Sequence, residues 1–132
     1  MAKRNNLTPA EWEIMEVVWA LGTEATVREV LERAYPKGEK AYTTVQTVMN
    51  TLAKKKLLRR KKTGMVNFYR PTCSKDDMAR AEMTTMVSRI FGGSIPALAN
   101  SLLSLDDFSL DQIEEIKKLL DEKARELREG DP

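Results

Sequence analysis

Hydrophobic residues recur at helical spacing in three short segments of the first half of the chain. The first segment begins at Thr8, which can cap a helix that starts with proline, and it ends at Gly22. The second segment follows Thr26 and stops before Pro36, and the third begins near Thr43. In each segment the apolar residues lie three and four positions apart, which predicts three amphipathic helices.

The period of the pattern changes after the third segment. Residues 57–62 and 66–70 form two short runs joined by Thr63-Gly64-Met65, which predicts a β-hairpin with a glycine-containing turn. Phe68 and Tyr69 are neighbours on the returning run, so we expect one ring in the core and the other toward solvent. Three short helices followed by a hairpin is the order of a winged helix-turn-helix domain.

The second half of the chain is helical again. Ser74, Ser94 and Ser109 precede apolar residues at helical spacing, and Gly92-Gly93 separates the first two of these helices. Three amphipathic helices in so short a stretch form a thin core, so their apolar stripes are expected to pack on a second copy of the chain. The predicted dimerisation residues are Met86, Ile90, Leu98, Leu102, Ile113, Ile116, Leu120 and Leu127.

The composition excludes several kinds of chemistry. The chain has no histidine and one cysteine, and its six glycines form no phosphate-binding loop, so we predict no metal site, no cofactor and no enzymatic activity. Its apolar stretches are too short to cross a membrane, so we expect no direct membrane insertion. A lone Cys73 suits a reducing compartment, and a cytoplasmic location is expected.

Charge is distributed unevenly along the chain. Residues 1–73 hold 14 Lys and Arg against 7 Asp and Glu, whereas residues 74–132 hold 8 against 13. Seven of the nine residues at positions 54–62 are cations, which repel one another unless an anion neutralises them. Beside a helix-turn-helix, such a cluster predicts contacts to the phosphates that flank a DNA groove.

The side of the third helix opposite its apolar stripe carries threonines, amides and one lysine. Amides, hydroxyls and methyl groups are the groups that read base edges in the major groove. A merely solvated face would favour Glu and Lys, because β-branched threonine lowers helix propensity. The predicted DNA-binding residues are therefore Thr43, Thr44, Gln46, Thr47, Asn50, Thr51 and Lys54 on the helix and Arg59, Arg60, Lys61 and Lys62 on the hairpin.

These observations predict a mainly α protein with a small β-hairpin wing. Residues 1–73 would form a winged helix-turn-helix DNA-binding domain, and residues 74–132 a helical dimerisation domain. Two alternatives stay open from the residues alone. One is a winged-helix regulator that senses a small molecule between its domains, and the other is a winged-helix module that binds proteins and no DNA.

Four segments, in order, carry a resemblance to a known family. They are Leu7–Met15 (LTPAEWEIM), Tyr42–Leu52 (YTTVQTVMNTL), Phe68–Pro71 (FYRP) and Phe108–Ile113 (FSLDQI). With these segments the chain resembles the penicillinase-repressor family of winged-helix regulators over residues 7–122. The family includes the repressors of β-lactamase and methicillin resistance and a copper-responsive branch.

The resemblance implies a homodimer that binds a palindromic operator and represses a promoter. It implies that residues 43–54 form the recognition helix. It also implies release of repression by a membrane sensor metallopeptidase that causes cleavage in the dimerisation domain, at a stretch that corresponds to Asn100, Ser101 and Leu102. Some members have an Asn–aromatic pair at this stretch, where this chain has Asn100-Ser101. The Cys-x-Cys pairs of the copper-responsive branch are not found in this sequence.

Overall fold

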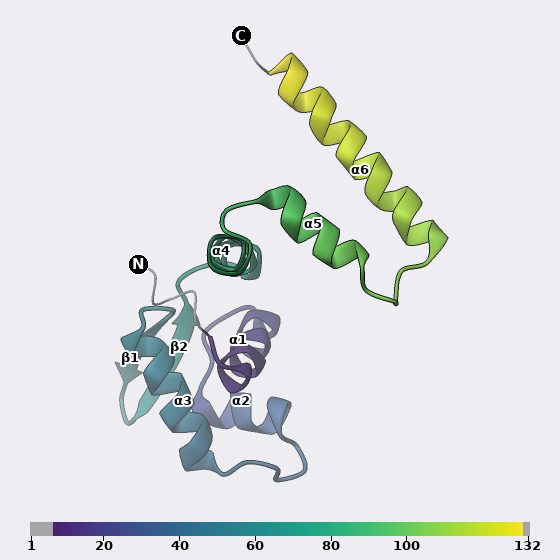
Figure 1. The fold of residues 1–132 in the computed structure, drawn as a ribbon. Coiled ribbons are helices and arrows are strands. Elements are labelled where there is room, and N and C mark those ends of the chain that lie inside the picture. The colour runs from purple at the N-terminus through teal and green to yellow at the C-terminus, as the bar shows by residue number, and fades with distance from the viewer. Residues whose placement is uncertain (1–6, 131–132) are drawn as a thin grey trace. The chain divides into compact units, whose positions relative to one another are not determined.

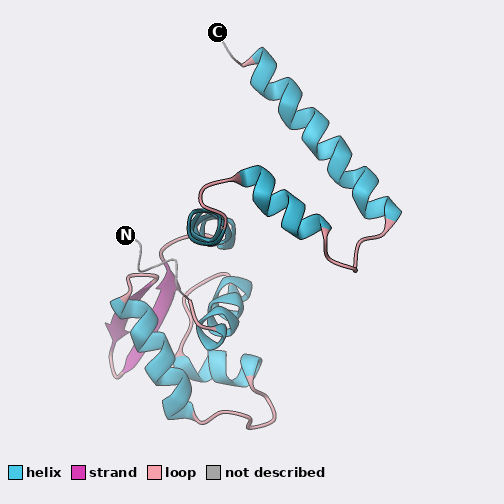
Figure 2. Cartoon of the chain, viewed as in Figure 1, coloured by secondary structure: helices cyan, strands magenta, loops and turns pink. Residues whose placement is uncertain are grey.

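The computed structural model describes residues 7–130; the outermost residues of both predicted domains, 1–6 and 131–132, lie outside this range. Over this range the chain is mainly helical with one antiparallel hairpin (Figures 1 and 2), as predicted. The elements are α1 (Pro9–Leu21), α2 (Val27–Ala34), α3 (Tyr42–Lys54), β1 (Leu58–Thr63), β2 (Val66–Pro71), α4 (Lys75–Ile90), α5 (Ile95–Leu103) and α6 (Leu110–Glu129).

Capping boxes fix where the first two helices begin. The hydroxyl of Thr8 accepts from the amide of Glu11 while the carboxylate of Glu11 accepts from the amide of Thr8, and Thr26 and Glu29 repeat the arrangement at α2. Gly22 ends α1 in the left-handed conformation, with φ of 78°. The helix starts predicted from Thr8 and Thr26 are thus confirmed, because side-chain oxygens satisfy amides that have no partner within the helix.

The core of the N-terminal part lies among α1, α2, α3 and the hairpin. Tyr69 is completely buried, while Phe68 on the opposite side of β2 is half-buried, as alternation along the strand predicts. The backbone of Tyr69 also pairs with Ala25, exchanging two hydrogen bonds of 2.8 Å. The buried hydrophobic residues are Ile14, Met15, Val18, Ala25, Val27, Val30, Val45, Met49, Leu52, Leu57, Leu58, Tyr69 and Met78.

The two tryptophans of α1 lie at the edge of this core rather than inside it. Each of them is half-buried and packs against the core from outside. Their rings contact each other, with centroids 5.9 Å apart, and the indole N–H of Trp19 donates to the carbonyl of Cys73 at 2.9 Å. An indole N–H needs an acceptor, and this one ties α1 to the chain just before α4.

A hydrogen bond fastens the end of α2 to α1. The hydroxyl of Tyr35 donates to Glu13 Oε1 at 2.7 Å. Burial raises the pKa of Tyr35 to about 12, and the hydrogen bond and the charge of Glu13 act in the same direction. The hydroxyl therefore stays protonated, and stays a donor, at any pH at which the protein would be studied.

The start of α4 belongs to the N-terminal unit. Met78 is 1% exposed in the core described above, and Lys75 pairs with Glu16 of α1 at 3.0 Å. The chain divides into two compact units, Met1–Arg89 and Ile90–Pro132. This division lies sixteen residues after the predicted domain boundary at 73/74, and α4 contributes Met78 to the winged-helix core. Whether α4 also serves in dimerisation stays a prediction.

The C-terminal unit contains α5 and α6, which begin at Ser94 and Ser109 as predicted. Each serine caps its helix, and Gln112 completes a capping box with Ser109. Neither helix contains a buried residue. The eight predicted dimerisation residues are all exposed or half-buried; the exposed ones are Met86, Ile90, Leu102, Leu120 and Leu127, and the half-buried ones are Leu98, Ile113 and Ile116.

Within residues 7–130, no helix combines the length and the apolar character needed to cross a bilayer.

Candidate nucleic-acid interface

α3 lies beside the hairpin (Figure 1). Its apolar side faces the core, and its threonine side faces outward. Val45, Met49 and Leu52 are completely buried. The polar residues predicted to read DNA divide by exposure. Thr43, Thr44, Thr47 and Lys54 are exposed, whereas Gln46, Asn50 and Thr51 are half-buried. The outward polar surface that the sequence predicts therefore exists, but Gln46, Asn50 and Thr51 belong to it only in part.

The hairpin carries its four predicted cations on both faces of β1. Arg59, Arg60, Lys61 and Lys62 are all exposed. Arg60 lies directly opposite Tyr69 and Lys62 opposite Asn67, which puts this pair of cations on the sheet face of Tyr69. Arg59 and Lys61 lie on the other face. Gly64, with φ of 65°, forms the tight turn at the tip, and Met65 beside it is exposed.

A concave surface lies between the end of α3 and β1. It is lined by four cations, Lys54, Lys56, Arg59 and Arg60, together with Asn50, Ala53, Leu58 and Thr72. Lys56 is a member that the sequence did not single out within the run of cations. It has φ of 67°, a region that favours glycine, and its carbonyl accepts a hydrogen bond from the Thr72 hydroxyl at 2.7 Å. Four cations around one concavity are suited to a phosphate group.

Asn50 connects α3 to both strands of the hairpin. Its Oδ1 accepts from the hydroxyl of Tyr69 at 2.7 Å and from Nη1 of Arg60 at 3.0 Å. The sequence places Asn50 on the outward side of the helix, but it does not reveal that the hairpin folds back against that position. No pattern along the chain could have identified this contact.

Lys55 is directed into the fold, unlike the other cations of the run. Its ammonium group donates to both carboxylate oxygens of Glu11 at 2.9 Å, and the side chains are 26% and 7% exposed, respectively. The expectation that the whole run contacts phosphates is therefore wrong for Lys55. This residue joins the end of α3 to the first turn of α1, where Glu11 also closes the capping box.

Replacing Glu11 by alanine should lower the free energy of unfolding by about 2–3 kcal/mol, because it removes the capping box and leaves Lys55 without its carboxylate. Glu29→Ala is the matched control, since it removes the same capping box from α2 and no ion pair, and it should cost about 1 kcal/mol. Urea denaturation of the three proteins measures both values. Equal losses for the two variants would show that the ion pair contributes nothing to stability.

A second concave surface lies between the starts of α2 and α3 and the tip of the hairpin. The guanidinium of Arg28 lies over the ring of Tyr42, 5.5 Å from its centroid, and both residues line this surface together with Gln46 and Asn67. Arg28 was not among the DNA-binding residues predicted from the sequence. The signal in the sequence was its position in the first turn of the helix that precedes the predicted recognition helix.

In the part of the chain that the structure describes, no three Asp, Glu, Cys or His side chains come together as a metal site would require. No Asp or Glu is among the residues that line the two concave surfaces described above.

The fold and this surface together define a winged helix-turn-helix protein, with α3 as the outward helix and β1–β2 as the wing. The chain belongs to the penicillinase repressor family, whose model matches residues 7–122. This is a family of transcriptional repressors and not of enzymes.

Comparisons with individual proteins agree with this assignment. The chain is 26% identical to a penicillinase repressor of Bacillus licheniformis over 98% of this chain and 100% of that protein. It is 24% identical to the methicillin resistance regulatory protein MecI of Mammaliicoccus sciuri, over 92% of this chain and 98% of that protein.

Two solved structures resemble the fold. The solution structure of the DNA-binding domain of the repressor BlaI is 30% identical, with a TM-score of 0.50, and covers 58% of this chain and 93% of that one. The crystal structure of the YusO protein of Bacillus subtilis has a TM-score of 0.52 at 17% identity, over 93% of this chain and 78% of that one, and supports the fold alone.

Proposed function

We propose that this protein represses transcription by binding a palindromic operator as a homodimer, with α3 in the major groove and the wing along the flanking phosphates. The observation that carries the proposal is the orientation of α3. Val45, Met49 and Leu52 are buried, and short hydrogen-bonding side chains face outward between cations. The similarity to the BlaI DNA-binding domain supports the same assignment.

Side-chain chemistry and exposure indicate which residues of the proposed interface contact bases and which contact phosphates. Hydroxyls, methyls and the amide of Gln46 can contact base edges, whereas lysines and arginines contact phosphates whatever the sequence. The base-contacting set is Thr43, Thr44, Gln46, Thr47 and Thr51, and the phosphate-contacting set is Lys54, Lys56, Arg59, Arg60, Lys61 and Lys62.

The homodimer is supported by the apolar residues that the C-terminal unit leaves uncovered. No residue of α5 or α6 is buried, although these helices carry seven leucines and three isoleucines. Exposing such a surface to water is unfavourable, and a second copy of the same stripe would cover it. A two-fold symmetric dimer presents two α3 helices, which matches an inverted-repeat operator.

The same unit contains the stretch proposed for proteolytic derepression. Asn100, Ser101 and Leu102 are exposed in the last turns of α5. Cleavage here would separate α6 from α5 and so remove part of the proposed dimer interface. We propose a membrane sensor metallopeptidase as the partner that triggers it, with the repressor itself acting in the cytoplasm.

A salt titration of DNA binding tests the proposed function. Affinity for random duplex should fall by about 10³–10⁵ between 50 and 200 mM salt if about 6–10 phosphates are contacted per dimer. The double variant Lys61→Gln, Lys62→Gln should make the dependence on salt shallower. Lys117→Gln, Lys118→Gln removes the same charge from α6 and should leave it unchanged. Electrophoretic mobility shifts measure all three proteins, and binding that is absent or indifferent to salt would instead indicate a protein-interaction module.

A further inference from the structure

Asn50 lies where α3 meets the hairpin, and its carbonyl oxygen accepts two hydrogen bonds there. The donors are the hydroxyl of Tyr69, at 2.7 Å, and Nη1 of Arg60, at 3.0 Å. The orientation of the amide follows from chemistry, because a guanidinium only donates and must therefore face an acceptor. Tyr69 is completely buried, whereas Arg60 is exposed.

This arrangement conflicts with base reading by Asn50. An asparagine recognises adenine with both ends of its amide, since the oxygen accepts from the base N6 and the nitrogen donates to N7. Both lone pairs of Asn50 Oδ1 are already engaged within the fold. Turning the amide toward a base would break both bonds and separate the buried Tyr69 hydroxyl from its acceptor, which is costly.

The same bonds give Asn50 a mechanical role. Arg60 and Tyr69 are a directly opposed pair on β1 and β2. The side chain of Asn50 is hydrogen-bonded to both, so it joins α3 to the two strands at the same position along the hairpin. Arg60 also lines the concave surface formed with Lys54, Lys56 and Arg59. A guanidinium has five N–H groups in a fixed plane, so holding Nη1 on Asn50 orients the remaining donors.

We propose that Asn50 is a positioning residue of the DNA interface: it holds the guanidinium of Arg60 for a phosphate, fixes the wing against α3, and reads no base. This inference rests on the proposed function. The proposal gives Asn50 and Thr47 different roles. Thr47 lies one turn earlier on α3 and is exposed, so its side chain can reach a base edge.

The experiment compares wild type, Asn50→Ala and Thr47→Ala on two duplexes, one selected by the wild-type protein from a random pool and one of random sequence. Asn50→Ala should weaken binding to both by the same factor, about tenfold, and reduce the salt dependence by about one phosphate per subunit. Thr47→Ala should reduce the preference for the selected duplex and leave the salt dependence unchanged. A selective loss of preference in Asn50→Ala would overturn the inference.

Asn50→Asp provides the rescue, because aspartate accepts from Arg60 and Tyr69 but has no N–H for a base. Asn67→Asp on β2 adds the same charge to the hairpin and is its matched control. Asn50→Asp should keep the wild-type preference and lose no more affinity than Asn67→Asp. Loss of preference in Asn50→Asp would overturn the inference. The comparison of Asn50→Asp with Asn67→Asp tests the inference even if Asn50→Ala fails to fold. Wild-type binding that is absent or indifferent to salt would instead overturn the proposed function and, with it, this inference.

Discussion

Replacing Leu120 by aspartate should convert the proposed homodimer to a monomer and weaken its binding to a selected inverted-repeat duplex by at least about 100-fold. The first effect is expected because a carboxylate cannot be buried in an apolar interface without a partner. The second is expected because two linked half-sites gain about 10²–10⁴ in affinity over one. Sedimentation velocity measures the mass, and a mobility shift measures the binding.

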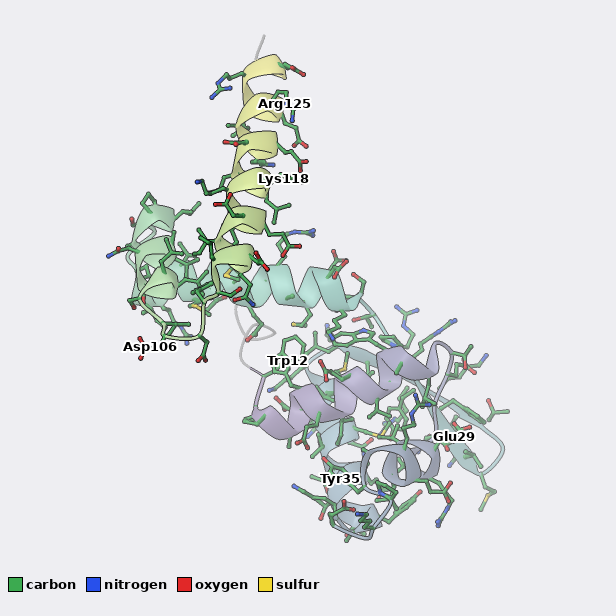
Figure 3. The ribbon with its side chains drawn as sticks, turned by 90° about the vertical axis from the view of Figure 1, so that its right-hand side faces the viewer. Trp12, Glu29, Tyr35, Asp106, Lys118 and Arg125 are labelled. Carbon is green, nitrogen blue, oxygen red and sulfur yellow. The ribbon has the colours of Figure 1, made fainter. Side chains whose placement is uncertain are left out.

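Leu120 is the appropriate position because its own chain does not need it. It is 63% exposed in α6, whereas Ile113 and Ile116 are half-buried and could affect folding if changed. All three lie on one stripe of the helix, and Lys118 lies on the opposite side. Figure 3 labels Lys118 on α6.

Lys118→Gln is therefore the matched control, since it changes the net charge by the same amount on the other face of α6. It should remain dimeric and bind the duplex as wild type does. Circular dichroism should show unchanged helix content in both variants. A dimeric Leu120→Asp protein would exclude this stripe as the interface.

Local signals in the sequence were sufficient for the elements and their order. Thr8, Thr26 and Ser109 each form the cap that their residue type predicts, and Gly22 and Gly64 adopt the left-handed backbone that a helix end and a tight turn require. These interactions join residues at most four positions apart, so the pattern along the chain contains the necessary information.

The contacts that shape the interface join distant residues, and the sequence did not reveal them. Lys55 meets Glu11 forty-four positions away, and Asn50 meets Tyr69 nineteen positions away. A helical wheel correctly places Asn50 on the polar side of α3, but it does not say which polar groups another element will cover. The chemistry of a polar residue near a tertiary contact depends on the partner brought to it by the fold.

Tyr69→Ala should produce the largest loss of stability in the N-terminal unit, about 3–5 kcal/mol. It removes a completely buried ring, and it also removes the hydroxyl that donates a hydrogen bond to Asn50. A domain of ordinary stability has only about 5–15 kcal/mol in total, so much of the protein should be unfolded at moderately raised temperature. Chemical denaturation followed by tryptophan fluorescence suits the measurement, since Trp12 and Trp19 pack against the same core.

Phe68→Ala tests whether the loss arises from burial or from the hairpin as such. Phe68 is the neighbouring aromatic residue on the same strand, but it lies on the other face and is only half-buried, so its removal should cost about 1 kcal/mol. If both variants lost the same stability, the inner face of β2 would contribute no more than its outer face, and Tyr69 could not be the residue that fastens the wing to the core. If the predicted difference is found, the stability of the N-terminal unit depends on the buried Tyr69 far more than on Phe68, and loss of DNA binding in Tyr69→Ala should follow its unfolding curve.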